Sequence, residues 1–296
     1  MKTLEVGKRI SLNNILFATD FSPHSNAALP YALAIARQYG AKLFGVHVVP
    51  SEDYLFTAPE SWPAHIQQEE QLRQEVDARL EAQLRGVPHE ALFGVGDVWN
   101  VLSQLVGKHD IDLLVVGTHG RTGARKLVMG SIAEKIFRQA ACPVLTVGPK
   151  VIHRQRSEAE FNQILLATDF GEESVAAARY AISLAQEHQA RLSLLHVLER
   201  PHVGAVDLES NSDFIVRRLQ ELVPKDAELW CHPEYFVQFG PPAERILEFC
   251  ATRGADIIVM GVRLTHGTVS TVTHLVHTTA QHIMAHATCP VLTVRG

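Results

Sequence analysis

The chain has 296 residues, of which 46% are hydrophobic and 20% are charged, and its formal net charge is −5. This length suffices for two domains of about 150 residues each. The acidic balance argues against a general nucleic-acid-binding protein, which usually carries a basic face. No apolar run approaches the roughly 18 residues that a membrane span needs, and the first residues lack the apolar stretch of a secretory signal. We therefore expect a cytoplasmic protein that binds neither nucleic acid nor membrane.

The sequence repeats itself once, and the repeat predicts its domain organisation. Three pairs of segments match, at offsets of 149, 149 and 147 residues: Ile15–Phe21 with Ile164–Phe170, Leu43–Val48 with Leu192–Val197, and Cys142–Val147 with Cys289–Val294. A nearly constant offset over the whole length indicates two tandem copies of one domain. We predict a first domain over residues 1–149, a linker over 150–160 and a second domain over 161–296.

Strands and helices alternate in the first copy. Its first strand is predicted to end at Asp20, and Ser22 with Pro23 is predicted to open a helix, because serine is a good N-cap and proline suits the first turn. Pro30 predicts a kink in this helix, and Gly40 its end. The further strands are expected at 42–49, 90–95, 112–116 and 144–147, and the further helices at 64–85, 97–108 and 131–140.

The second copy repeats this order. After a first strand that ends near Asp169, a helix presents Ala178, Ala181, Ile182 and Ala185 on one face. Strands are expected at 191–198, 234–239, 256–260 and 291–294, and helices at 212–223, 242–253 and 278–287. Alternating strands and helices with continuous apolar strands predict an α/β protein with parallel sheets covered on both faces. Ligands of such sheets bind at the carboxyl ends of the strands, where the chain order reverses.

One such end carries a glycine constellation. Gly117 and Gly120 follow the apolar run 113–116, and Gly130 and Ser131 precede a helix. A glycine loop between a strand and a helix N-terminus can hold a phosphate, because bare N–H groups and the helix dipole face the anion. Asp20 would face the same crevice if the first strand neighbours the fourth, and its carboxylate suits a ribose hydroxyl or an adenine amine. Tight turns without a ligand, and capping roles for Asp20 and Ser131, stay open as alternatives.

The second copy carries this constellation in an altered form. Gly261 follows the strand and Thr265-His266-Gly267 resembles Thr118-His119-Gly120, but three extra residues separate the two glycines. His277 stands where the first copy has Gly130. A bulky imidazole there is expected to keep a phosphate from the backbone, so we expect the second copy not to hold ATP in the way of the first.

Taken together, the Ala-Thr-Asp-Phe-Ser run at 18–22, the His47-Val48 strand, the glycine motif and the closing Cys-Pro-Val-Leu-Thr-Val resemble the universal stress protein family. The resemblance covers each half of the chain. It implies two tandem Rossmann-like domains of the adenine nucleotide alpha hydrolase type, each with a five-stranded parallel sheet and helices on both faces. It also implies ATP, with AMP, ADP and an accompanying Mg²⁺ as alternatives. The residues that it assigns to the nucleotide are Thr19, Asp20, Val48, Val116, Gly117, His119, Gly120, Gly130, Ser131 and Ile132.

The family resemblance further implies pairing of the two domains through their last strands, with a homodimer as an open alternative. Arg121, Arg125 and Lys126 are candidate phosphate contacts or simply solvated charges. We expect no metal site, although His282 and His286 have helical spacing, and we favour burial over redox chemistry for the cysteines. The chain has no Walker A motif and no nucleophile elbow. Nucleotide-dependent assembly or partner binding in a stress response is therefore favoured over a scaffold that binds no nucleotide and over a slow ATPase or a nucleotidyl transferase.

Overall fold

The computed structural model describes residues 9–50, 62–118, 130–151, 160–199, 206–225, 227, 230–263 and 278–295, with side chains left out at 62–68 and 206–211. These residues divide into two compact units. The N-terminal unit runs from Ser11 to Val147. The C-terminal unit begins at Gly148, and Arg9 and Ile10 belong to it.

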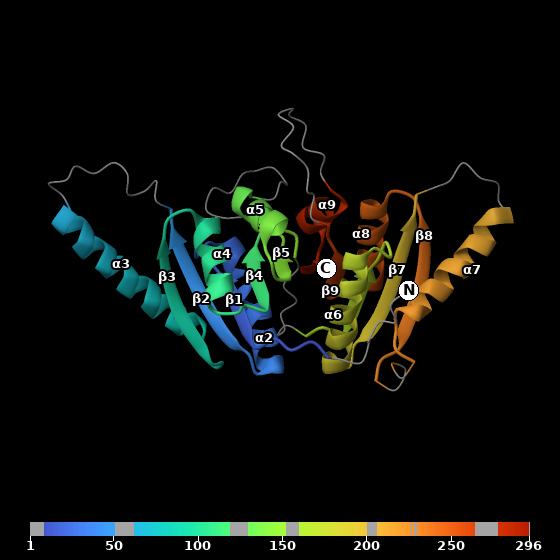
Figure 1. The fold of residues 1–296 in the computed structure, drawn as a ribbon, viewed down its shortest axis with the longest axis horizontal. Helices are drawn as coiled ribbons and strands as arrows, with labels where there is room; N and C mark the ends of the chain where they lie inside the picture. The colour runs from blue at the N-terminus through green and yellow to red at the C-terminus, as the bar shows by residue number, and fades with distance from the viewer. Residues whose placement is uncertain are drawn as a thin grey trace, which may run out of the picture. The chain divides into compact units, whose positions relative to one another are not determined.

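The N-terminal unit is built on five parallel strands. They are β1 (Asn14–Ala18), β2 (Lys42–Val49), β3 (His89–Val95), β4 (Leu113–Gly117) and β5 (Val144–Val147). Their spatial order is β3-β2-β1-β4-β5, so the direction in which the chain adds strands reverses between β1 and β4 (Figure 1). The register pairs Ala18 with Val46 on one side and with Val116 on the other.

Helices cover both faces of this sheet. They are α1 (Pro23–Asn26), α2 (Leu29–Tyr39), α3 (Trp62–Gln83), α4 (Val98–Lys108) and α5 (Ser131–Gln139). On one face, Trp99 and Leu102 of α4 and Ile136 of α5 join alternate strand residues such as Phe44 and Val46 in a buried cluster. On the other face, α2 contacts β1 and β2, and α3 contacts β2 and β3.

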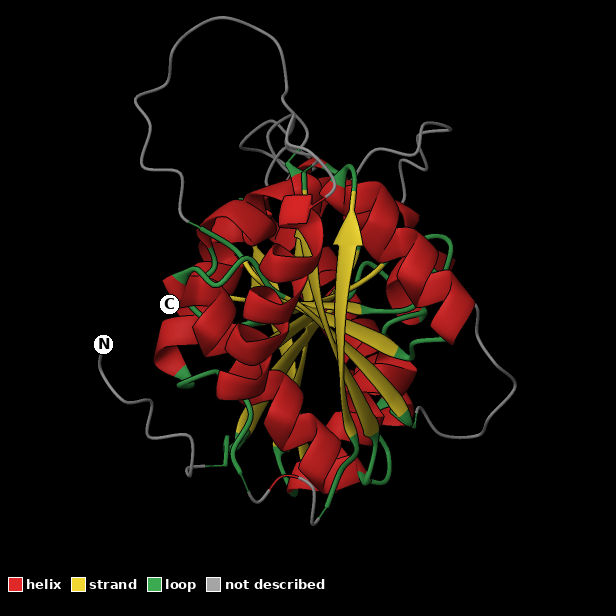
Figure 2. Ribbon diagram, turned by 90° about the vertical axis from the view of Figure 1, so that its right-hand side faces the viewer, coloured by secondary structure: helices red, strands yellow, loops and turns green. Residues whose placement is uncertain are grey.

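The C-terminal unit repeats the architecture. Its strands are β6 (Gln163–Ala167), β7 (Arg191–Leu198), β8 (Pro233–Phe239), β9 (Ile257–Gly261) and β10 (Val291–Val294), all parallel and in the order β8-β7-β6-β9-β10. Its helices are α6 (Glu172–His188), α7 (Val206–Glu221), α8 (Pro242–Arg253) and α9 (Thr279–His286). In Figure 2 the helices lie on both sides of the strands. The predicted fold class is thereby confirmed.

Two sequence predictions need correction near the first strand. β1 ends at Ala18 rather than at Asp20, because the chain turns after Thr19 into a bend at Phe21, whose φ is +61°. The predicted kinked helix is two helices, with Pro30 in the first turn of α2, where its missing N–H costs nothing. The C-terminal unit has Arg179 at the matching position, and its helix α6 runs unbroken over 17 residues. Gly40 ends α2 as expected, with a φ of +64°.

Among the helices of the residues that the structure describes, none combines the length and apolar character that a membrane crossing needs.

Candidate functional site

The carboxyl ends of β1 and β4 lie side by side in the N-terminal unit, where the strand order reverses. Asp20 follows β1, and Gly117 ends β4. The first strand is therefore the neighbour of the fourth, as is required for Asp20 and the loop after Gly117 to face one crevice. Open α/β sheets bind their ligands at this kind of point.

Asp20 lies in a tight turn that its own side chain stabilises. The backbone N–H of Ser22 donates to Oδ1 of Asp20 over 2.9 Å, an arrangement typical of an Asx turn. Ser22 in turn is the N-cap of α1, and its hydroxyl accepts from the N–H of Ser25 over 3.1 Å. The helix cap is therefore Ser22 and not Asp20. An ionised carboxylate carries about four acceptor positions, so the turn bond is compatible with bonds to a ligand.

Thr19 holds this turn in place through every polar group that it has. Its N–H donates to the carbonyl of Val46, and its buried hydroxyl accepts from the N–H of Phe21 over 2.9 Å. Its carbonyl lies 2.7 Å from Nδ1 of His47, which donates to it. Thr19 is therefore placed to orient Asp20 rather than to offer its hydroxyl to a ligand.

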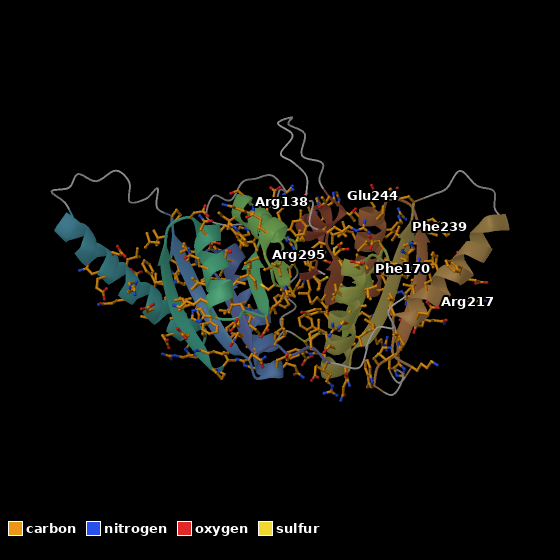
Figure 3. The ribbon with its side chains drawn as sticks, in the orientation of Figure 1. Arg138, Phe170, Arg217, Phe239, Glu244 and Arg295 are labelled. Atoms are coloured by element: carbon orange, nitrogen blue, oxygen red, sulfur yellow. The ribbon has the colours of Figure 1, made fainter. Side chains whose placement is uncertain are left out.

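The side chain of Phe21, in the same turn, is stacked between a histidine and an arginine, an arrangement that the sequence did not predict. The ring of Phe21 lies 4.8 Å from the ring of His47, and the guanidinium of Arg79, on α3, lies 4.1 Å from the centre of the Phe21 ring. Phe170, labelled in Figure 3, repeats the stack in the C-terminal unit with His196 at 4.7 Å and Arg218 at 4.1 Å. The signal available in the sequence was the repetition of both phenylalanines and both histidines, although it does not reveal the arginines.

Gly117 has a packing role that explains its lack of a side chain. A Cβ atom at this position would lie 2.7 Å from the carbonyl oxygen of His24 and 2.9 Å from Cα of Ser25. Gly261, at the end of β9, meets the backbone of Glu173 and Ser174 even more closely. In both units the glycine lets the helix that comes after the first strand, α1 or α6, approach the strand that ends in the glycine. This close packing also explains why Gly261 persists in the copy whose loop is altered.

Gly130 has a different role, at the start of α5. Its N–H donates to the carbonyl of Thr118 over 2.9 Å, which ties the beginning of the helix to the end of β4. Gly130 is the N-cap, with an ordinary φ of −61°, and no side chain in the described part of the unit caps the helix. Ser131 is thus the first helical residue and not the cap, and Ser131 and Ile132 are both exposed.

The remaining predicted ligand residues divide into two groups. Val116 is only 3% exposed within the core, and Val48 is partly buried against the same cluster. Both side chains therefore pack in the core on the side of α4 and α5. His119 and Gly120, like Arg121, Arg125 and Lys126, lie outside the described residues.

In the C-terminal unit an ion pair occupies the position that matches Asp20. Oδ1 of Asp169 accepts from the hydroxyl of Ser174 over 2.6 Å and from the N–H of Gly171 over 2.9 Å. Oδ2 lies 3.0 Å from the guanidinium of Arg263, which also lies 3.5 Å from Glu173. Burial raises the pKa of Asp169, but the two hydrogen bonds and the charge of Arg263 outweigh it and lower that pKa below its usual value.

The helix start that matches α5 is also closed in the C-terminal unit. Thr278 is the N-cap of α9, and its hydroxyl accepts from the N–H of Gln281, while the Gln281 side chain accepts from the N–H of Thr278. This capping box uses N–H groups that an anion would otherwise contact. The capping box is a difference between the two copies in addition to the predicted one at His277, which lies outside the described residues.

The histidine pair considered for a metal is engaged locally. The rings of His282 and His286 stack with their centres 4.3 Å apart, and Nδ1 of His286 donates to the carbonyl of His282 over 2.9 Å. Within the described ranges, no three His, Cys, Asp or Glu side chains form a group that could hold a metal ion. His274 falls outside those ranges.

A separate cavity of about 490 Å³ opens at the carboxyl ends of β7 and β8. Its lining comes from Glu199, Phe239, Gly240, Pro241, Pro242 and Arg245. Figure 3 labels Phe239 at the end of β8 and Glu244 in the first turn of α8, beside the lining residues. The volume lies within the usual range for small-molecule sites, about 300–1,000 Å³.

Comparisons with known proteins place both halves in one family. The sequence model of the Universal stress protein family matches residues 11–148 and 160–295. A universal stress protein of Thermus aquaticus is 36% identical over 137 residues, which are 45% of this chain and 96% of that protein. Universal stress protein A homolog 1 of Coxiella burnetii is 34% identical over 140 residues, which are 46% of this chain and 96% of that protein.

Among solved structures, a universal stress protein from Archaeoglobus fulgidus resembles the chain over its whole length. The TM-score is 0.71 at 20% sequence identity, and the match covers 97% of this chain and 99% of that chain. At this identity the likeness supports the fold.

Proposed function

The chain belongs to the universal stress protein family, and we propose that its N-terminal domain binds an adenine nucleotide, ATP in the first place. The bound state would alter assembly or partner contacts in a stress response. The proposed site combines the turn at Asp20 with the start of α5. In this proposal the domains are residues 1–149 and 161–296, joined by the linker 150–160.

The observation that carries the proposal is the start of α5, which no described side chain caps and which lies at the end of β4, the strand beside β1. Gly130 offers no side chain, Ser131 and Ile132 are exposed, and no side chain of the described residues caps the first N–H groups of the helix, which suits an anion. The Gly130–Thr118 hydrogen bond holds this start at the end of β4, whose neighbour β1 leads to Asp20. In this arrangement the phosphates would lie at the start of α5 and the ribose at the carboxylate of Asp20.

The charge at the start of the helix after the first strand also distinguishes the two copies. The first turn of α1 holds no acidic residue, whereas the first turn of α6 holds Glu172 and Glu173. Two carboxylates beside Asp169 repel a polyphosphate, and Arg263 is already paired with Asp169 and Glu173. We therefore propose that the C-terminal domain does not bind ATP in the manner of the N-terminal domain.

Calorimetric titration of the nucleotide-free chain tests the proposal. We expect one equivalent of ATP to bind per chain, more tightly than AMP, because a triphosphate offers the start of α5 more anionic oxygens than the single phosphate of AMP does. Titrations with and without Mg²⁺ separate binding of the free nucleotide from binding of its magnesium complex. The absence of any heat of binding up to about 1 mM ATP would refute the proposal and favour the scaffold hypothesis.

Two variants make this titration specific. Asp20→Asn keeps the shape of the turn and an acceptor for the Ser22 N–H, but it removes the charge that a ribose hydroxyl would bind. We expect weaker binding of both ATP and AMP. Asp169→Asn makes the matched change in the C-terminal domain, and ATP binding should stay unchanged. A phosphate-release assay on the unmodified chain tests the ATPase alternative, which requires turnover that Asp20→Asn abolishes.

Assembly is measured separately, because the proposed pairing through the last strands and the homodimer both stay predictions. Light scattering with and without ATP gives the mass of the particle in each state. A mass that changes with ATP supports nucleotide-dependent assembly.

A further inference from the structure

Two cysteines of the C-terminal domain lie in contact. Cys250 is in the last turn of α8, and Cys289 precedes Pro290 and β10. Their sulfur atoms are 3.4 Å apart, and the two residues are only 2% and 4% exposed. A disulfide bond is about 2.0 Å long, so the two sulfurs have to approach each other by roughly 1.4 Å for the bond to form.

The N-terminal domain has one of these two thiols and lacks the other. Cys142 precedes Pro143 and β5 as Cys289 precedes β10, but Val106 stands at the position of Cys250. The equivalence is visible in the backbone, because the carbonyl of Val106 accepts from Ile111 and that of Cys250 accepts from Ala255, both over 3.0 Å. Val106 packs against the buried cluster that contains Cys142. The thiol pair is thus a particular feature of the C-terminal domain.

We propose that Cys250 and Cys289 are a redox modification site, which a peroxide converts to an intramolecular disulfide. This proposal goes beyond nucleotide binding and does not depend on it. It also revises the expectation that Cys289 serves only for packing.

The contact assigns different roles to the two thiols. The hydrogen bond with Cys289 and a second bond with Thr288 lower the pKa of Cys250 against the opposing effect of burial. The same contact with Cys250, together with burial, raises the pKa of Cys289 well above its usual value. Cys250 is therefore the more acidic of the two thiols and the one that reacts first, since the thiolate is the nucleophilic form.

The reaction has two balanced steps. The Cys250 thiolate attacks one peroxide oxygen, the O–O bond breaks, and the products are a sulfenic acid and, after proton uptake, an alcohol or water. The sulfur of Cys289 then attacks the sulfenic sulfur, the S–O bond breaks, and the hydroxide leaves as water with the Cys289 proton. Overall, two thiols lose two electrons and two protons, and one peroxide is reduced.

The bond would join two parts of the domain that lie far apart in sequence. It would close a loop between residues 39 positions apart, which restricts the unfolded chain. Oxidation should therefore raise the Tm of the C-terminal domain by about 5 °C or more. It would also anchor the last turn of α8, whose first turn contributes Pro242 and Arg245 to the 490 Å³ cavity.

Peptide mapping of the full chain tests the proposal. The reduced protein is exposed to hydrogen peroxide, denatured, alkylated and digested without reductant. We expect a peptide that joins Cys250 to Cys289 and is lighter by two hydrogen atoms than its reduced parts. Cys142 and Cys231 should not react with the peroxide and should be alkylated afterwards; in the folded protein burial raises the pKa of Cys231 to about 11, so little of its reactive thiolate is present.

Variants add a second measurement. Cys250→Ser should abolish both the joined peptide and the rise in Tm, whereas Cys142→Ser should preserve both. Complete alkylation of Cys250 and Cys289 after peroxide, or a bond from Cys289 to any other cysteine, would overturn the proposal. The mapping uses the unmodified chain, so it decides the question even where Cys250→Ser fails to fold.

Discussion

Replacing Gly130 with histidine reproduces in the N-terminal domain the residue that the C-terminal domain has at the matching position. The backbone of Gly130 has a φ of −61° and a ψ of 151°, which any residue adopts. Among the described residues, a Cβ there meets the carbonyl oxygen of Thr118, at 3.3 Å, so a shift of a few tenths of an ångström relieves that contact. The cost to folding should thus stay below about 1 kcal/mol, which lowers Tm by less than about 4 °C.

The cost to ATP binding should be much larger. The imidazole would stand in front of the N–H groups of Ser131 and Ile132, and each hydrogen bond to a charged group contributes about 1.5–3 kcal/mol. The loss of two such bonds is about 3–6 kcal/mol, which weakens ATP binding by roughly 10²- to 10⁴-fold.

Calorimetry with ATP and thermal unfolding of the same Gly130→His sample measure the two effects. The matched control is Gly107→His, because Gly107 lies on α4 and no atom of the described part of the chain comes within 4 Å of a Cβ placed there. This control should bind ATP as the unmodified chain does. If Gly130→His binds ATP within about threefold of the unmodified chain, the start of α5 does not hold phosphate and the reasoning is wrong.

Three further changes test other contacts. Gly117→Ala should cost about 1–3 kcal/mol of stability in urea without any nucleotide, because the α1 backbone must move away; an unchanged midpoint would show that packing does not require the glycine. Arg263→Ala should raise the pKa of Asp169 in an NMR titration. The lowered pKa of Asp169 stabilises the fold above pH 3.8, and this contribution disappears as the pH falls through the folded-state pKa. The variant should therefore unfold at a higher pH during acid titration. An equal acid midpoint for the two proteins would contradict the ion pair. Arg79→Ala should cost about 0.5–1 kcal/mol through its stack on Phe21, whereas Arg79→Lys, which keeps a cation, should cost less.

Local patterns were enough to predict the alternating elements of the fold. Strands 42–49 and 191–198 and helix 242–253 have the predicted bounds, because an apolar run or a 3.6-residue period is a property of neighbouring residues. Pro30 was interpreted as a kink and instead lies in the first turn of α2, because the pattern does not show that one helix ends and a second begins just before the proline.

The candidate site was less accessible to sequence reasoning. The pairing of Asp169 with Arg263 joins residues 94 positions apart, and the stack of Arg79 on Phe21 joins α3 to the turn that follows β1. Such contacts depend on which strands are neighbours and on side-chain direction, and neither can be obtained from one sequence. The contact between Cys250 and Cys289 was missed for the same reason.

The packing of Gly117 and Gly261 has a consequence for how related sequences are surveyed. A glycine that a helix backbone requires is needed for packing whether or not its domain binds a ligand, and both Gly117 and Gly261 are of this kind. Its presence therefore diagnoses the architecture and says nothing about activity. A search for nucleotide-binding relatives should give this first glycine no weight and should score the residue before the last helix, together with the capping residues that follow it.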